Sequence, residues 1–162
     1  MRSLYKRQLA MMVGVTVLSF TLLSTAFMLL SYRYIISEKR DSMERNAGYI
    51  VSFTSSYYQR YLSIQDDFYR SYVASIALIS DSYVIVANPD GEIIYATDGH
   101  NFYEYKNTKV PENLVSQVLD QGSYTGMTNL GGIYPERRYM AARPVFSSTI
   151  AGNTIVHGLV LV

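Results

Sequence analysis

Hydrophobic side chains fall into two patterns along this chain, and the first is a continuous apolar run over residues 9–30. It lies inside a 25-residue stretch, 8–32, that has no charged side chain. About 20 apolar residues suffice for a helix to cross a bilayer. A cleaved signal peptide has a shorter apolar region followed by small residues, whereas bulky side chains from Phe27 to Leu30 stand here where a cleavage site would be. We therefore predict a retained transmembrane helix over 9–32.

The polar and apolar positions that follow keep a helical period. No glycine or proline interrupts 33–47, so a helix over 33–62 should continue out of the membrane. Residues 9–62 would then form one continuous helix that can transmit a movement across the membrane. An apolar line at heptad spacing along this helix can serve either a dimer partner or the protein's own core. Its members are Ile36, Arg40, Met43, Ala47, Ile50, Thr54, Tyr57 and Tyr61. If the line serves a partner, the core would be contacted by Val51, Tyr58 and Leu62.

A second helix is predicted over 65–80, because apolar residues recur there at helical spacing. Ser63 and Asp66 fit a capping box at its start. A short helix should begin at Pro111 and Glu112, since proline suits a first helical turn, and it should stop at Gly122.

From residue 82 the pattern changes to β-rich runs separated by turn residues. Strands are predicted over 82–88, 92–97, 123–130, 137–146 and 154–162. The first two are joined by a turn from Asn88 to Gly91, and the last two by a small polar turn ending at 151–153. This grouping predicts an α+β fold, with a five-stranded, mainly antiparallel sheet and helices on one face.

Composition and charge narrow the functions that are possible. The 162 residues carry a net charge of +1 and include no cysteine. A nucleic-acid partner is not expected without a clustered basic surface, and a chain without cysteine has no disulfide and no thiolate chemistry. Arg2, Lys6 and Arg7 precede the apolar run without an acidic neighbour, which favours a cytoplasmic amino terminus. We therefore expect a cytoplasmic tail, 1–8, and an extracytoplasmic domain, 33–162, with a net charge of −2.

Three passages follow one another behind the apolar run: 84–95 with its Asp90-Gly91 turn, 110–122 with its proline and short helix, and 141–146 together with 158–162. In this order they resemble the extracytoplasmic sensor region of bacterial membrane histidine kinases, the PAS-like class called PDC or Cache. The resemblance implies a PAS-like sheet and a homodimer in the bilayer. It also implies that binding of a small-molecule or peptide ligand, or of a partner, is transmitted through the membrane helix.

In that family the sensor region is followed by a second membrane helix, a HAMP linker, a phosphoacceptor helix and an ATP-binding domain. None of these regions occurs within these residues, so the chain is expected to be a sensing part without enzymatic activity or cofactor. A chemoreceptor or a diguanylate cyclase can carry the same outer domain. A pilin-like subunit and an anchored exported protein, either binding or hydrolytic, are further alternatives, although no pilin cleavage site and no catalytic cluster is present.

The resemblance also implies a ligand pocket between the sheet and the loop and short helix that cross it. Positive side chains there commonly hold carboxylates through paired donors. By that analogy the candidate residues are Tyr95, Tyr103, Tyr124, Arg138, Tyr139 and Arg143. Side chains alternate along a strand, so Arg143 should share a face with Tyr139 and not with Arg138. We predict Tyr139 and Arg143 as a ligand-binding pair, with ordinary exposed strand arginines as the alternative.

A divalent metal site is the other kind of site that the residue types allow. Asp98, His100 and Glu104 contain suitable ligand types. A single histidine in a polar turn is more often solvated, and no metal site is predicted.

Overall fold

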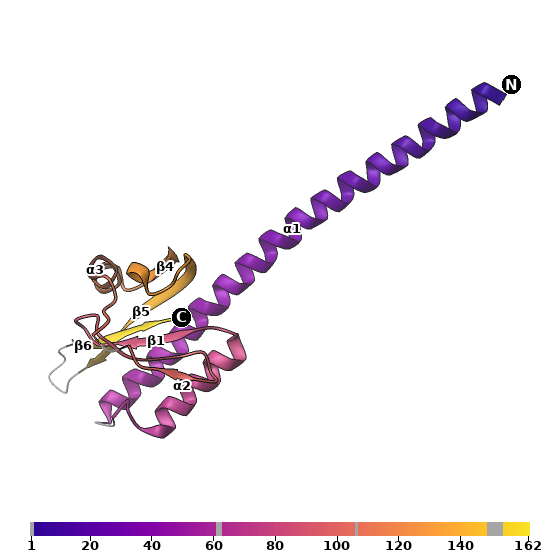
Figure 1. Ribbon diagram of the computed structural model, residues 1–162. Coiled ribbons are helices and arrows are strands. Elements are labelled where there is room, and N and C mark those ends of the chain that lie inside the picture. Colours follow the sequence, from indigo (N-terminus) through magenta and orange to yellow (C-terminus); the bar gives the residue numbers. More distant parts are fainter. Residues whose placement is uncertain (1, 61–62, 106, 149–153) are drawn as a thin grey trace. The chain divides into compact units, whose positions relative to one another are not determined.

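The computed structural model describes residues 2–60, 63–105, 107–148 and 154–162 (Figure 1). The chain forms two units, Met1–Lys39 and Arg40–Val162. Helix α1 (Arg2–Gln59) begins in the first unit and ends in the second. The predicted roles of Tyr61 and Leu62, and the predicted turn at 151–153, lie outside the described residues.

The first unit is the amino-terminal part of α1, and its apolar side chains are exposed over the whole run. This helix is long and apolar enough to span a membrane, although a signal sequence would meet the same criterion. Four hydroxyls within it donate to the carbonyl four residues earlier, those of Thr16, Ser19, Thr21 and Thr25. Because these hydroxyls are satisfied within their own helix, they give no sign of a partner helix.

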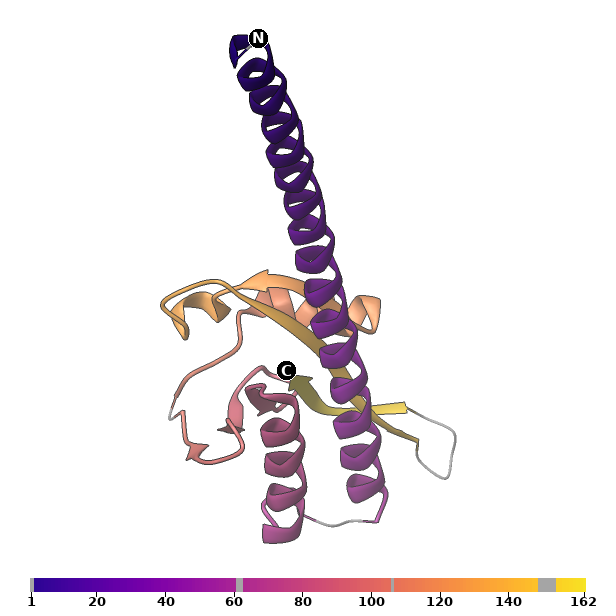
Figure 2. The same cartoon turned by 90° about the vertical axis from the view of Figure 1, so that its right-hand side faces the viewer.

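The second unit contains a six-stranded antiparallel sheet in the order β3-β2-β1-β6-β5-β4 (Figures 1 and 2). Its strands are β1 (Val84–Ala87), β2 (Ile93–Thr97), β3 (Phe102–Tyr103), β4 (Tyr124–Thr128), β5 (Arg138–Ser148) and β6 (Thr154–Leu161). The first and last strands lie side by side, with Val86 paired with Val160. The α+β class is therefore confirmed, whereas a PAS-like topology stays a prediction.

The strand count was wrong by one, because no strand was predicted where β3 lies. β3 pairs with the edge of β2, with Tyr103 opposite Ala96. Both of its residues are exposed. Two exposed residues show no alternation of apolar and polar positions, which is the signal that a half-buried strand leaves in a sequence.

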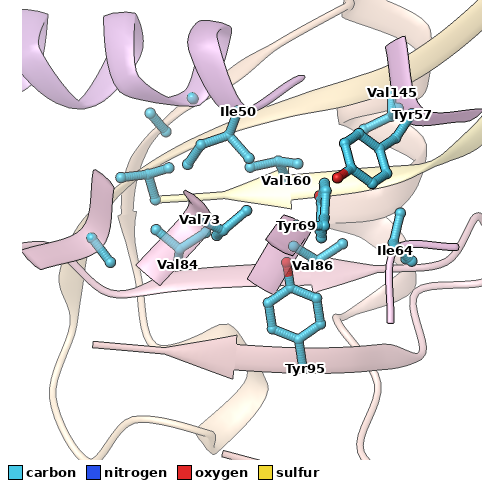
Figure 3. Close-up of a cluster of buried hydrophobic side chains, with 14 residues drawn as sticks. Ile50, Tyr57, Ile64, Tyr69, Val73, Val84, Val86, Tyr95, Val145 and Val160 are labelled. Atoms are coloured by element: carbon cyan, nitrogen blue, oxygen red, sulfur yellow. The ribbon is translucent and has the colours of Figure 1, made fainter. Parts of the chain in front are cut away.

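One face of the sheet is covered by the carboxy-terminal part of α1 and by α2 (Asp67–Ser80), which lie side by side in Figure 2. Figure 3 shows the apolar cluster between these helices and the sheet. α1 contributes four buried residues to this face, Ala47, Ile50, Thr54 and Tyr57. At these positions the heptad line packs into the protein's own core, whereas a dimer through this helix stays a prediction. Val51 and Tyr58 are only partly buried beside the same cluster.

The opposite face is covered by α3 (Glu112–Gln121), which corrects the prediction of helices on one face only. Leu114, Val115 and Val118 pack there in a second cluster with Ile85 of β1. All four residues of β1 are buried. A strand that is apolar on both sides needs cover on both faces, and the short amphipathic helix supplies the second cover.

The turns explain where these elements begin and end. Asp66 itself caps α2, since its carboxylate accepts a hydrogen bond from the Phe68 amide at 2.9 Å. The predicted capping box is wrong, because the Ser63 hydroxyl accepts from the Gln65 amide instead. α3 ends as predicted at Gly122, which has a left-handed φ of 74°.

Candidate functional site

A groove of about 550 Å³ lies in the second unit, where α1 passes over β5. Seven of its lining residues come from α1 and one comes from β5. They are Asp41, Glu44, Arg45, Gly48, Tyr49, Val51, Ser52 and Arg143. The groove is therefore a surface that one helix and one strand build together.

The spacing of its residues along α1 explains why they meet. Asp41, Arg45, Gly48 and Ser52 follow one another by three or four positions, which places them on one side of a helix. Gly48 has no side chain, and a Cβ atom there would lie 3.9 Å from a terminal guanidinium nitrogen of Arg143. The Arg143 guanidinium therefore lies close to the helix at the position of Gly48.

The charges in the groove are only partly neutralised. The Arg40 guanidinium lies 3.2 Å from a Glu44 carboxylate oxygen, and this hydrogen bond raises the pKa of Arg40. Within the described parts of the chain, Asp41, Arg45 and Arg143 are in no ion-pair contact. One carboxylate and two guanidinium groups therefore remain available to a bound molecule.

Tyr139 and Arg143 share the face of β5 that is turned toward α1, as the alternation of side chains predicted. Ala141 and Val145, which lie on the same face at every second position of the strand, belong to the cluster under α1. However, four residues of strand separate the two by about 13 Å. The Tyr139 hydroxyl is buried and has no hydrogen-bond partner among the described residues. The two thus share a face about four strand residues apart, and their role as a ligand-binding pair stays a prediction.

Tyr95 is part of the core. It is 3% exposed, and Figure 3 shows its ring pointing into the cluster that contains Tyr69. Its hydroxyl lies near Tyr69 but has no hydrogen bond of good geometry to a described residue, and burial raises its pKa above the usual range. The Arg70 guanidinium lies over the ring of Phe102 at 4.5 Å, beside Tyr95. The ring of Tyr95 thus fills space between elements.

The other predicted residues lie elsewhere. Tyr103 is at the sheet edge, where its hydroxyl donates to Asp98 at 2.8 Å. Tyr124 packs against the cluster on the α3 side. Arg138 lies over the ring of Tyr134, 4.8 Å from its centre, and so points away from Arg143 as expected. The structure therefore does not bring the predicted residues together, and the space between the sheet and α3 holds the second apolar cluster.

The turn at Asp98 uses its carboxylate for local hydrogen bonds. The carboxylate accepts from the Asn101 amide at 2.7 Å, from the Tyr103 hydroxyl and from the His100 amide. These bonds hold the pKa of Asp98 well below its usual range. Among the residues that the structure describes, no group of three potential metal ligands is found.

Neither a scan of protein-family models nor a search of curated proteins found a match to this chain.

Sequence reasoning missed the α1 side of the groove. Asp41, Arg45 and Gly48 lie in a segment that was read only for its apolar period. The available signal was Gly48 itself, because glycine costs a helix interior about 1 kcal/mol relative to alanine and so suggests a close approach. That signal does not tell which strand residue approaches.

Proposed function

We propose that this protein is a membrane-anchored, extracytoplasmic sensor domain of a two-component histidine kinase, acting as a dimer. The observation that carries the proposal is that one helix serves both parts of the chain. α1 includes the apolar run at 9–30, and it also supplies Ile50 and Thr54 to the core of the second unit. A change in how the core holds α1 therefore acts on the element that would cross the membrane.

Ligand binding in the groove could cause such a change. A molecule bound there touches Arg143 on β5 and Asp41 on α1 at once, so its affinity depends on the relative positions of strand and helix. A ligand shifts a conformational equilibrium only as far as it binds one state better than the other. A coupling of about 1–3 kcal/mol is typical of such transitions.

The kinase assignment and the orientation rest on the sequence. The resemblance to sensor kinases provides the first, and the basic residues before the apolar run provide the second. Because the outer domain does not specify its output, a chemoreceptor or a diguanylate cyclase would use the same mechanism of transmission.

Thiol labelling tests the anchor and its orientation. The chain has no cysteine, so a single introduced cysteine reports one position without background. In intact bacteria producing the chain, a membrane-impermeant maleimide should label Asp120→Cys. It should label Lys6→Cys only after lysis and Val17→Cys only after the membrane is dissolved. Labelling of Lys6→Cys in intact cells, or release of a shortened soluble protein, would overturn the proposal.

A further inference from the structure

We propose that the groove between α1 and β5 binds a short peptide as a zwitterion, with the carboxylate on Arg143 and the ammonium group on Asp41. This inference rests on the proposed sensory function and adds the chemical class of the ligand. It uses charged groups that form no ion pair with a described residue, in the groove where helix and strand meet.

Arg143 provides the carboxylate end of the site. Its guanidinium is the only charged group that β5 contributes to the lining, and it is in no ion pair with a described residue. Guanidinium groups bind carboxylates through two parallel hydrogen bonds. Gly48 leaves the room beside α1 in which a carboxylate can approach. Ser52, one turn further along α1, places a hydroxyl next to the same end.

Asp41 provides the ammonium end. Two carboxylates line that part of the groove, but Glu44 is already held by Arg40. Asp41 is exposed and has no ion-pair partner among the described residues. An ammonium group at this end meets an available carboxylate, whereas a ligand carboxylate would be repelled by Asp41.

The distance between the two ends selects the length of the ligand. Asp41 and Gly48 are seven residues apart on one helix, a rise of about 10 Å. Within a single amino acid the nitrogen and the carboxyl carbon are only about 2.5 Å apart, while three extended residues span about 10 Å. A tripeptide therefore reaches both ends. Between them, Arg45 can donate to a peptide carbonyl, and the Tyr49 ring, which is 59% exposed, offers an apolar surface.

Titration calorimetry on the full chain in lipid nanodiscs tests this assignment with three matched peptides. Triglycine carries both charges, N-acetyl-triglycine only the carboxylate and triglycine amide only the ammonium group. We expect saturable binding of triglycine, and at least tenfold weaker binding of each blocked peptide. Absence of triglycine binding, or equal binding of a blocked peptide, would overturn the inference.

Variants locate the binding. Arg143→Gln and Asp41→Asn should each weaken triglycine binding at least tenfold, and Gly48→Leu should abolish it by filling the groove. Arg60→Gln and Asp120→Asn make the same changes of charge at exposed positions outside the groove and should bind like the unchanged chain. Equal losses in the control variants would contradict a site in this groove.

A second readout on the same samples separates this inference from the proposed function. Disulfide formation between single cysteines in the apolar run of two chains reports the membrane helix. If triglycine binds at Arg143 and Asp41 while this crosslinking stays constant, the site stands and transmission through α1 is contradicted. If triglycine does not bind, the ligand class is wrong, and the labelling of Lys6→Cys and Asp120→Cys still decides the anchor.

Discussion

The hydroxyl oxygens of Thr54 on α1 and Tyr69 on α2 lie 2.6 Å apart in the core of the second unit, and both residues are fully buried. Thr54 also donates to the carbonyl of Ile50 at 2.6 Å. A hydroxyl has only one hydrogen, so the hydrogen bond between the two must be donated by Tyr69. Burial raises the pKa of Tyr69 to about 12, which keeps this donor protonated at neutral pH.

Replacing the acceptor of this bond should destabilise the second unit. Thr54→Val keeps the shape of the side chain but leaves the Tyr69 hydroxyl buried without a partner, at a cost of about 1–3 kcal/mol. Urea unfolding in detergent, followed by near-ultraviolet circular dichroism of the tyrosines, measures the loss. Ser56→Ala removes a similar hydroxyl at an exposed position of α1 and should stay within about 0.5 kcal/mol.

A double mutant decides whether the pair itself is responsible. Tyr69→Phe added to Thr54→Val removes the Tyr69 hydroxyl that the single variant leaves without an acceptor. The double variant should therefore lose less stability than the sum of the two single losses. Strict additivity would show that the two hydroxyls do not interact.

Gly158 of β6 is a second position at which a substitution should lower the stability. A Cβ atom there would lie 2.1 Å from the carbonyl oxygen of Ala87 in the neighbouring strand β1. Backbone atoms in a sheet cannot move aside without breaking the strand pairing. Gly158→Ala should therefore lower the free energy of unfolding by at least about 2 kcal/mol in the same measurement. Gly48→Ala meets nothing closer than 3.9 Å and should stabilise α1 by about 0.5–1 kcal/mol. Equal stability of Gly158→Ala and the unchanged chain would refute the close approach.

The pH dependence of stability should carry a contribution from His157. Its ring is stacked on Tyr58 of α1 at 4.1 Å, it shares a hydrogen bond with the Ser147 hydroxyl, and burial lowers its pKa. The unfolded chain, with a histidine pKa of about 6.5, then binds a proton more readily than the folded chain. This contribution to stability is fully present above about pH 6.5 and is lost as the pH falls further.

His157→Phe keeps the stacking and removes the titration. The unfolding free energies of the unchanged chain and of this variant are measured from pH 7.5 to pH 5. As the pH falls, the unchanged chain should lose stability relative to the variant. A difference that stays constant over that range would contradict the role of His157.

The sequence predicted the regular elements well because their signals are local. The turn at Gly91, the proline before α3 and the stop at Gly122 all appear where local chemistry placed them. The position of α3 on the opposite face could not be predicted, because it depends on contacts with Ile85 that are distant in sequence. Thr54 is a polar member of the otherwise mostly apolar heptad line, and only its hydrogen bond with Tyr69 explains its place in the core.

The site was predicted less well, because it too depends on contacts between residues that are distant in the sequence. Alternation along β5 correctly placed Tyr139 and Arg143 on one face. It could not tell which helix covers that face, nor that Gly48 of α1 would lie beside Arg143. Such a groove depends on two elements that are almost a hundred residues apart in the chain, and no local pattern records it.

If the second unit acts as the proposed sensor, its core sets the rotation of the apolar part of α1, because both belong to one helix. Single cysteines placed one by one from Val15 to Leu23 report which face of that helix forms disulfides between two chains in membranes. Inserting one alanine after Asp41 should rotate the reactive face by about 100°, since a helix has 3.6 residues per turn, and inserting seven should nearly restore it. The same reactive face with and without the single alanine would show that the apolar part of α1 orients independently of the second unit, and would contradict the proposed transmission.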